Sequence, residues 1–272
     1  MNDEMKDYEM LNKETKEALI NVCKNHCYQN KESVIVPEPY IPHIPKNWNG
    51  ILVLADRQNI NLGDDYYKWL NEHKTEPEIL MTRLEQKPYK ADWIGVGPWD
   101  DGTVKLALQA IFEGANLDLK VENVAVSNAV PWTKKNKSKN ENPNDRKQDK
   151  VVEKLMQDKA VEFWKEIFEI WNDIKMLIVL GDSAERVMKK AGILKKDEVK
   201  WLKLRHPSLP RLNRIVGKFN TYEIGKKCPM VQKALESLNI RRENVKYYNN
   251  MVFYTCEAVS LGVEKFKECF GT

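Results

Sequence analysis

The sequence predicts an α/β fold, a central four-stranded and mostly parallel sheet flanked by helices. Short apolar runs alternate with longer segments of helical periodicity, which is typical of parallel strands joined by crossover helices. About 42% of the 272 residues are hydrophobic, enough to build a sizeable core. We therefore expect a single domain over residues 1–272, with its core at about 48–215 and helical extensions at 1–47 and 216–272.

Four short apolar runs are the predicted strands. Runs of this length and composition are typical of strands that are buried on both faces of a parallel sheet. The third run stops at Gly181, and the fourth alternates apolar and polar residues. In chain order the runs are Ile51–Leu54, Val121–Ser127, Lys175–Leu180 and Val199–Leu204.

Helical periodicity fills the gaps between these runs, with apolar residues at three- and four-residue spacing. Asp182 or Ser183 is expected to cap one helix, and Gly192 is expected to end it. A helical stretch and then a proline-rich stretch are expected before residue 48. The predicted helices cover Thr103–Glu113, Val151–Ile174, a segment ending at Lys190, and one or two helices within 229–272.

The positive charge of the chain is concentrated in one polar segment. Thr133–Lys150 has no hydrophobic residue and holds seven Lys or Arg against three Asp or Glu. The excess of four equals the formal net charge of the whole chain. We expect a solvated surface loop, which either serves no further purpose or also binds phosphates through Lys134, Lys135 and Lys137.

Cysteine and histidine usage favours a protein without metal or cofactor. The five cysteines are odd in number and form no CxxC pair, as expected of free thiols in a reducing compartment. Cys23 and Cys27 could be half of an iron–sulfur site, but no further cysteine follows until Cys228, and the four histidines lack ligand spacing. The acidic N-terminus has no signal-peptide pattern, and no apolar run is long enough to span a membrane. We expect a cytoplasmic, monomeric protein that does not bind membranes.

Polar side chains follow the predicted strands. In an open parallel sheet, ligands bind beyond the carboxyl ends of the strands, so these segments should converge on one cleft. The cleft would hold an acid, an amide, an imidazole, an indole and several guanidinium groups. The segments are Ala55–Asn59, Asn128–Trp132, Arg205–Arg214 and, ahead of a predicted helix, Gly97–Gly102.

This set of segments resembles the uracil-DNA glycosylase superfamily. The second motif of that family begins His-Pro-Ser and ends with Arg, and this chain has HPSLPRLNR from His206 to Arg214. The family's base-reading Asn follows a hydrophobic strand, as Asn128 does in VAVSN. Over roughly residues 48–215 the order of segments is similar to the branch with the thermostable bacterial and archaeal enzymes. That branch stacks a Pro-Phe pair on the base, and Pro98-Trp99 stands at the matching place.

The resemblance implies a monofunctional DNA glycosylase that flips a uracil or a modified pyrimidine out of single- or double-stranded DNA. Breaking the N-glycosidic bond puts positive charge on the sugar and negative charge on the base. Asp56 would stabilise the sugar cation and position water, and His206 would donate to the base O2. Asn128 would pair with the base edge, Trp99 would stack on its face, and Asn59 would lie beside C5. The implied DNA contacts are Pro207, Ser208, Arg211, Leu212, Arg214, Lys134, Lys135 and Lys137, with Leu209 or Leu212 as a wedge into the base stack.

The first motif departs from the family's pattern. It normally reads Gly, a polar residue, a third residue and then Pro, whereas this chain has Ala55-Asp56-Arg57-Gln58. Asp56 matches the catalytic Glu of the thermostable branch, while other branches place their Asp or Asn where Arg57 stands. The most familiar enzymes follow the Pro with a Tyr that excludes thymine, and this chain has Asn59 there. The positions of the branch's iron–sulfur cysteines after the second strand are empty, so no cluster is expected.

Each assignment has a structural alternative. Asp56 would then cap a helix or pair with Arg57, Asn128 would satisfy a turn, Trp99 would belong to the core, and His206 would only shape a loop. For the whole chain, the alternatives are a non-catalytic DNA- or base-binding protein of the same fold and an unrelated nucleotide-processing enzyme. The latter would need a glycine-rich phosphate loop, and GxxxxGK[ST] does not occur. The glycosylase would serve base-excision repair or attack modified phage DNA.

Overall fold

The computed structural model describes eleven segments of the chain, and the structural statements that follow concern these residues. They are 17–18, 21–22, 25–26, 34–36, 44–45, 47–60, 102–135, 143–171, 173–207, 228–244 and 247–271.

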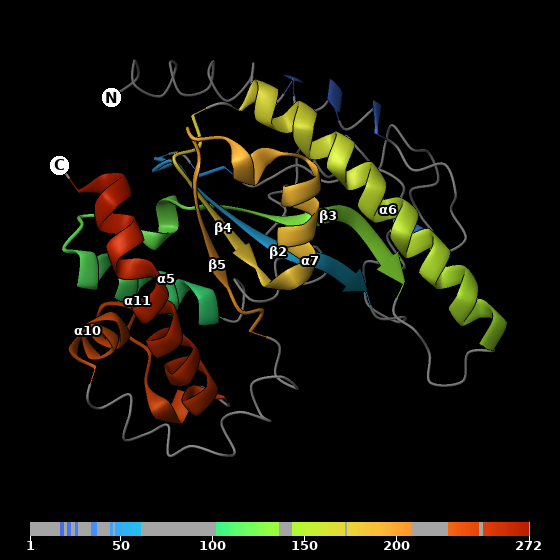
Figure 1. The fold of residues 1–272 in the computed structure, drawn as a ribbon. Helices are drawn as coiled ribbons and strands as arrows, with labels where there is room; N and C mark the ends of the chain where they lie inside the picture. Colours follow the sequence, from blue (N-terminus) through green and yellow to red (C-terminus); the bar gives the residue numbers. More distant parts are fainter. Residues whose placement is uncertain are drawn as a thin grey trace, which may run out of the picture.

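A five-stranded sheet in the order β1-β3-β2-β4-β5 forms the centre of the structure (Figure 1). The four neighbours β3, β2, β4 and β5 are parallel, which confirms the predicted α/β class and its four-stranded parallel sheet. The edge strand β1 is antiparallel to β3 and comes from the N-terminal extension, where no strand was expected. The strands are β1 (Val34–Val36), β2 (Ile51–Ile60), β3 (Ala125–Lys135), β4 (Met176–Leu180) and β5 (Lys200–Leu204).

Helices cover both faces of this sheet (Figure 1). One face carries α5 (Thr103–Ala115), α10 (Pro229–Ser237) and α11 (Tyr248–Phe270), and the other carries α6 (Pro143–Ile170) and α7 (Gly181–Lys190). We name them the α5/α11 face and the α6/α7 face. The 3-10 turns are η1 (Val121–Asn123), η2 (Ile193–Lys195) and η3 (Arg242–Asn244).

Strict alternation along the central strands explains their continuous apolar composition. In β4, Ile178 and Leu180 join the core of the α5/α11 face, whereas Leu177 and Val179 join that of the α6/α7 face. β4 is therefore apolar at every position, because both of its faces are covered.

The C-terminal extension is part of the core, as expected from its apolar pattern. Its described part contains the helices α10 and α11, and α11 packs closely on α5 through glycines. A Cβ atom on Gly262 would lie 2.7 Å from Ile111 Cδ1, and one on Gly114 would lie 2.8 Å from Val263 Cγ2. The two helices thus approach more closely than larger residues at these positions would allow.

Several predicted boundaries are wrong. β2 and β3 run on to Ile60 and Lys135 because they keep pairing beyond the apolar core, with a register shift between Arg57 and Asn59. Within the second predicted strand, residues 121–123 form η1 instead. The predicted helix at Val151–Ile174 ends at Ile170.

The predicted polar loop is also wrong over much of its length. Thr133–Lys135 belongs to β3, and residues 143–150 form the first turns of α6, which begins at Pro143. Proline suits a first helical turn because its missing N–H needs no partner there. The sequence of these turns, PNDRKQDK, contains no strongly hydrophobic residue, so hydrophobic periodicity could not reveal them.

The predicted side-chain cap of α7 is wrong as well. The helix begins at Gly181, before either predicted cap, and its N-cap residue Leu180 makes no side-chain capping bond. The carboxylate of Asp182 instead accepts a hydrogen bond from Lys203 Nζ at 2.6 Å. Among the helices that the structure describes, none has the length and apolar character needed to cross a membrane.

Candidate functional site

The carboxyl ends of the four parallel strands bring the predicted acid, amide and imidazole to one edge of the sheet. Ala55 pairs with Asn128 across β2 and β3, so Asp56 lies one residue beyond this pair. Leu54 pairs with Val179 and Leu180 with Leu204, so β4 and β5 end at nearly the same level. Because neighbouring strands are about 4.8 Å apart, the backbones of Asp56 and His206 are separated laterally by roughly 10 Å.

Asn128 is held inside the protein at this edge. Its side chain is only 1% exposed. It alternates in phase with Val126 and pairs with Ala55, both of which belong to the core of the α5/α11 face. Asn128 therefore lies on that face, in β3 rather than in the turn that the structural alternative required.

Asp56 is partly exposed and lies within β2, whereas it was expected beyond the end of this strand. Its position in a strand excludes the alternative that it caps a helix. The pairing with Arg57 is also wrong, because the Arg57 guanidinium lies 3.2 Å from Glu153 of α6. Asp56 makes no ion pair with any residue that the structure describes.

His206 follows β5 as expected and packs against the first residue of α7. Gly181 has a φ of +85°, and a Cβ atom placed on it would lie 2.9 Å from His206 Cβ. The strand order puts Gly181, at the end of β4, between Asp56 and His206. Glycine therefore permits the close approach of His206, and any side chain at position 181 would collide with it. Sequence reasoning treated Gly181 only as a strand terminator and missed this role.

Ion pairs fix the carboxyl end of β5, two residues before His206. Arg205 donates from Nη2 and Nε to Glu257 of α11 at 2.8 and 3.1 Å, a bidentate pair that raises the pKa of the guanidinium. Lys203 donates to Asp182 and Glu185 of α7 at 2.6 and 2.7 Å. These bonds raise the pKa of Lys203, chiefly through Asp182. The segment before His206 is thus tied to a helix on each face of the sheet.

The pKa of Glu185 is lowered by the same network. The largest cause is the hydrogen bond from Lys189, followed by the one from Lys203. The carboxylate therefore stays ionised and keeps both lysines engaged, which stabilises the position of α7 against β5.

The first turn of α11 reaches the same edge, which the sequence did not indicate. A Cβ atom on Gly102, just before α5, would lie 3.8 Å from Met251 Cε. Next to these residues, Thr103 and Asn250 are each 6% exposed. The only signal in the sequence is the amide of Asn250, which stands at a position of α11 that the apolar pattern predicts to be buried.

The structure describes some of the other predicted site residues fully, some only by their place in a strand, and some not at all. Pro207 is buried. Trp132, the indole expected in the cleft after the second strand, is fully buried and packs near Phe163 with ring centroids 6.1 Å apart, so it is a core residue. For Asn59, Lys134 and Lys135 the structure gives only their places in β2 and β3. Outside the described residues lie Trp99, Lys137, Ser208, Leu209, Arg211, Leu212 and Arg214, together with Cys23 and Cys27.

No group of three or more His, Cys, Asp or Glu side chains that could hold a metal ion occurs among the described residues. No protein-family model matches the chain. A search of curated proteins gives no significant match either.

Proposed function

We propose that the protein is a DNA glycosylase that flips a uracil or a modified pyrimidine out of DNA and hydrolyses its N-glycosidic bond. The supporting observation is that three strands far apart in the sequence bring a carboxylate, a buried amide and an imidazole to one edge of the sheet. This chemistry needs an anion near the sugar, a donor near the base and an amide that pairs with the base edge.

In the proposed reaction, Asp56 stabilises the cation that develops on the sugar and orients the attacking water. His206 donates a hydrogen bond to the base O2 and stabilises the departing anion. Asn128 pairs with the edge of the flipped pyrimidine, and its burial fixes the amide before the base arrives. The backbones of Asp56 and His206 are two strand spacings apart, roughly 10 Å, with the end of β4 between them.

A second candidate function is binding of DNA or a base without catalysis. One observation favours it. Asp56 and Arg57 lie within β2, and Arg57 pairs with Glu153, so the first motif is not the glycine- and proline-bounded turn of the glycosylases that the sequence resembles.

Glycosylase assays distinguish the two functions. The protein is incubated with oligonucleotides carrying uracil, hydroxymethyluracil, hypoxanthine or modified cytosines, and abasic sites are then cleaved with alkali. We expect strand breaks on at least one pyrimidine substrate and none with the His206→Ala variant, which controls for contaminating enzymes. DNA binding without strand breaks on any substrate would support the second function, and absence of both would contradict both proposals.

A further inference from the structure

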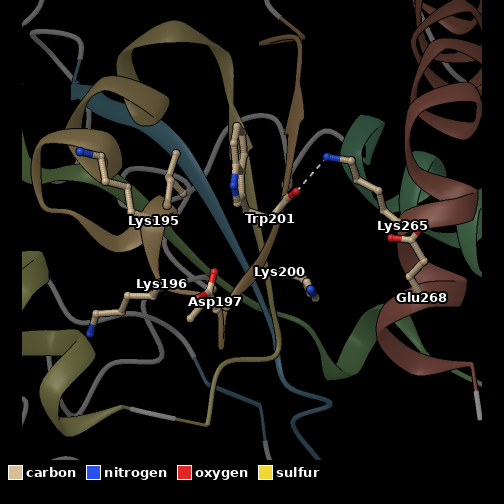
Figure 2. Close-up of a pocket in the computed structure, with 9 residues that line it drawn as sticks. Lys195, Lys196, Asp197, Lys200, Trp201, Lys265 and Glu268 are labelled. Carbon is tan, nitrogen blue, oxygen red and sulfur yellow. Dashed lines mark hydrogen bonds between the residues drawn. The ribbon is translucent and has the colours of Figure 1, made fainter.

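A pocket of about 270 Å³ lies at the opposite edge of the sheet from Asp56, Asn128 and His206 (Figure 2). It forms where the segment after α7 leads into β5 and where the last turns of α11 pass that strand. At about 3.3 Å per residue, the length of β5 puts Lys200 in this pocket roughly 20 Å from His206. The pocket is therefore separate from the candidate functional site.

An aromatic ring forms one wall of the pocket. Trp201 is partly exposed near the start of the edge strand β5. Lys265 of α11 places its Nζ 5.4 Å from the centroid of the indole and donates to the Trp201 carbonyl at 3.2 Å. Figure 2 shows this lysine reaching across from α11 to β5. The ring packs against the core of the α6/α7 face, and Lys265 reaches it from α11 across β5 and puts a positive charge beside it.

Positive charge predominates around this ring. The lining contains four lysines, Lys195, Lys196, Lys200 and Lys265, against the two acids Asp197 and Glu268. Lys189, Lys203 and Lys267 elsewhere on the protein pair with carboxylates. By contrast, none of the four pocket lysines forms an ion pair with any residue that the structure describes.

The lysines have different places in the pocket. Lys195 and Lys196 point away from the indole in Figure 2, so they add to the positive potential without approaching the ring. Lys200 and Lys265 come from β5 and α11 and lie on the α11 side of Trp201. An anionic group would therefore meet two ammonium groups next to an aromatic surface.

We propose that this pocket binds one nucleotide unit, either a free nucleoside monophosphate or a residue of a single strand. The base packs against Trp201, and the phosphate lies between Lys200 and Lys265. The carboxylates of Asp197 and Glu268 accept hydrogen bonds from sugar hydroxyl or base amino groups. The volume suits a single nucleotide, since pockets for larger ligands reach several hundred Å³. The indole distinguishes this ligand from inorganic phosphate and from an acidic peptide, which have no planar ring to place there.

Calorimetric titration with thymidine monophosphate tests the proposal, because this ligand carries no base for a uracil glycosylase to remove. We expect binding that weakens at least tenfold in Lys200→Glu and in Trp201→Leu. Lys267→Glu is the matched control, since Lys267 also lies on α11 but pairs with Glu264 at 2.8 Å and does not line the pocket. The control should bind like the parent.

Further ligands identify the source of the nucleotide. A free monophosphate that binds as tightly as a thymidine pentanucleotide indicates a free nucleotide, and a strong preference for the pentanucleotide indicates a single strand. Three results would overturn the proposal: no binding of either ligand, unchanged binding in both pocket variants, or equal binding of pyrophosphate or a short poly-glutamate peptide. None of these results depends on glycosylase activity, so the proposal can fail or succeed independently of the proposed function.

Discussion

Gly181 and His206 are packed so closely that a Cβ atom on the glycine would lie 2.9 Å from the Cβ atom of the histidine. The contact joins the start of α7 to the segment after β5, and it leaves no room for a side chain at position 181. Two of the testable predictions concern this edge of the sheet directly.

The first prediction is that Gly181→Ala lowers both stability and activity. Its backbone φ of +85° is unfavourable for alanine by about 1–2 kcal/mol, and the new methyl group would also displace His206. Gly192→Ala is the matched control, because Gly192 has a φ of +78° but no atom within 4 Å of the added Cβ. Thermal unfolding and the oligonucleotide assay measure both variants. Equal losses of stability and equal activity in the two would show that the contact with His206 has no consequence.

The second prediction is that Asp56→Asn reduces turnover about 100- to 1,000-fold and leaves DNA binding intact. The carboxylate would act on the sugar cation of the transition state, which does not exist in the bound ground state. Single-turnover cleavage and a binding titration separate the two effects. Parental turnover in this variant would show that the Asp56 carboxylate does not stabilise the sugar cation, and it would contradict the proposed mechanism.

The third prediction concerns the substituent at pyrimidine C5. Asn59 stands where the familiar enzymes of the resembled superfamily place a Tyr, so we expect a wider pocket that accepts a hydroxymethyl or a larger polar group. The ratio kcat/KM on oligonucleotides that differ only at C5 measures this preference. Asn59→Tyr should shift it toward unsubstituted uracil. A parent enzyme that already prefers plain uracil strongly would contradict the prediction.

The fourth prediction concerns the pH dependence of a half-buried thiol, that of Cys256. Burial, with a smaller contribution from Cys228, raises the pKa of Cys256 to about 11. Since the thiolate is the reactive form, alkylation of Cys256 in the folded protein should be slow at pH 8 and should accelerate up to about pH 11. The raised pKa also stabilises the folded state below pH 9, the ordinary range of a thiol, and this stabilisation is lost as the pH rises toward 11.

Mass spectrometry of the peptide that contains Cys256 follows this alkylation over time. The unfolded chain is the control, because its thiol titrates near the ordinary pKa of 9.0 and should react much faster at pH 8. Equal rates at pH 8 in the folded and unfolded chain would contradict a raised pKa of Cys256 in the folded protein.

The sequence by itself determined the fold class and the order of its elements. Strands covered on both faces must be apolar at every position, so runs such as Ile51–Leu54 and Lys175–Leu180 are recognisable from composition alone. Parallel strands place their carboxyl ends at one edge, so the convergence of Asp56, Asn128 and His206 also followed from the order of strands and helices. These features depend on local patterns and on one topological rule.

Only the tertiary structure decided which side chains surround these residues. The partner of Arg57 is Glu153, almost a hundred residues away, and the groups that fix the end of β5 come from α7 and α11. Position 181 requires glycine because His206 packs against it. The first turns of α6 form where hydrophobic periodicity gave no signal. Such contacts join segments that are distant in the chain, and their choice depends on packing and charge in three dimensions, to which local hydrophobic patterns are insensitive.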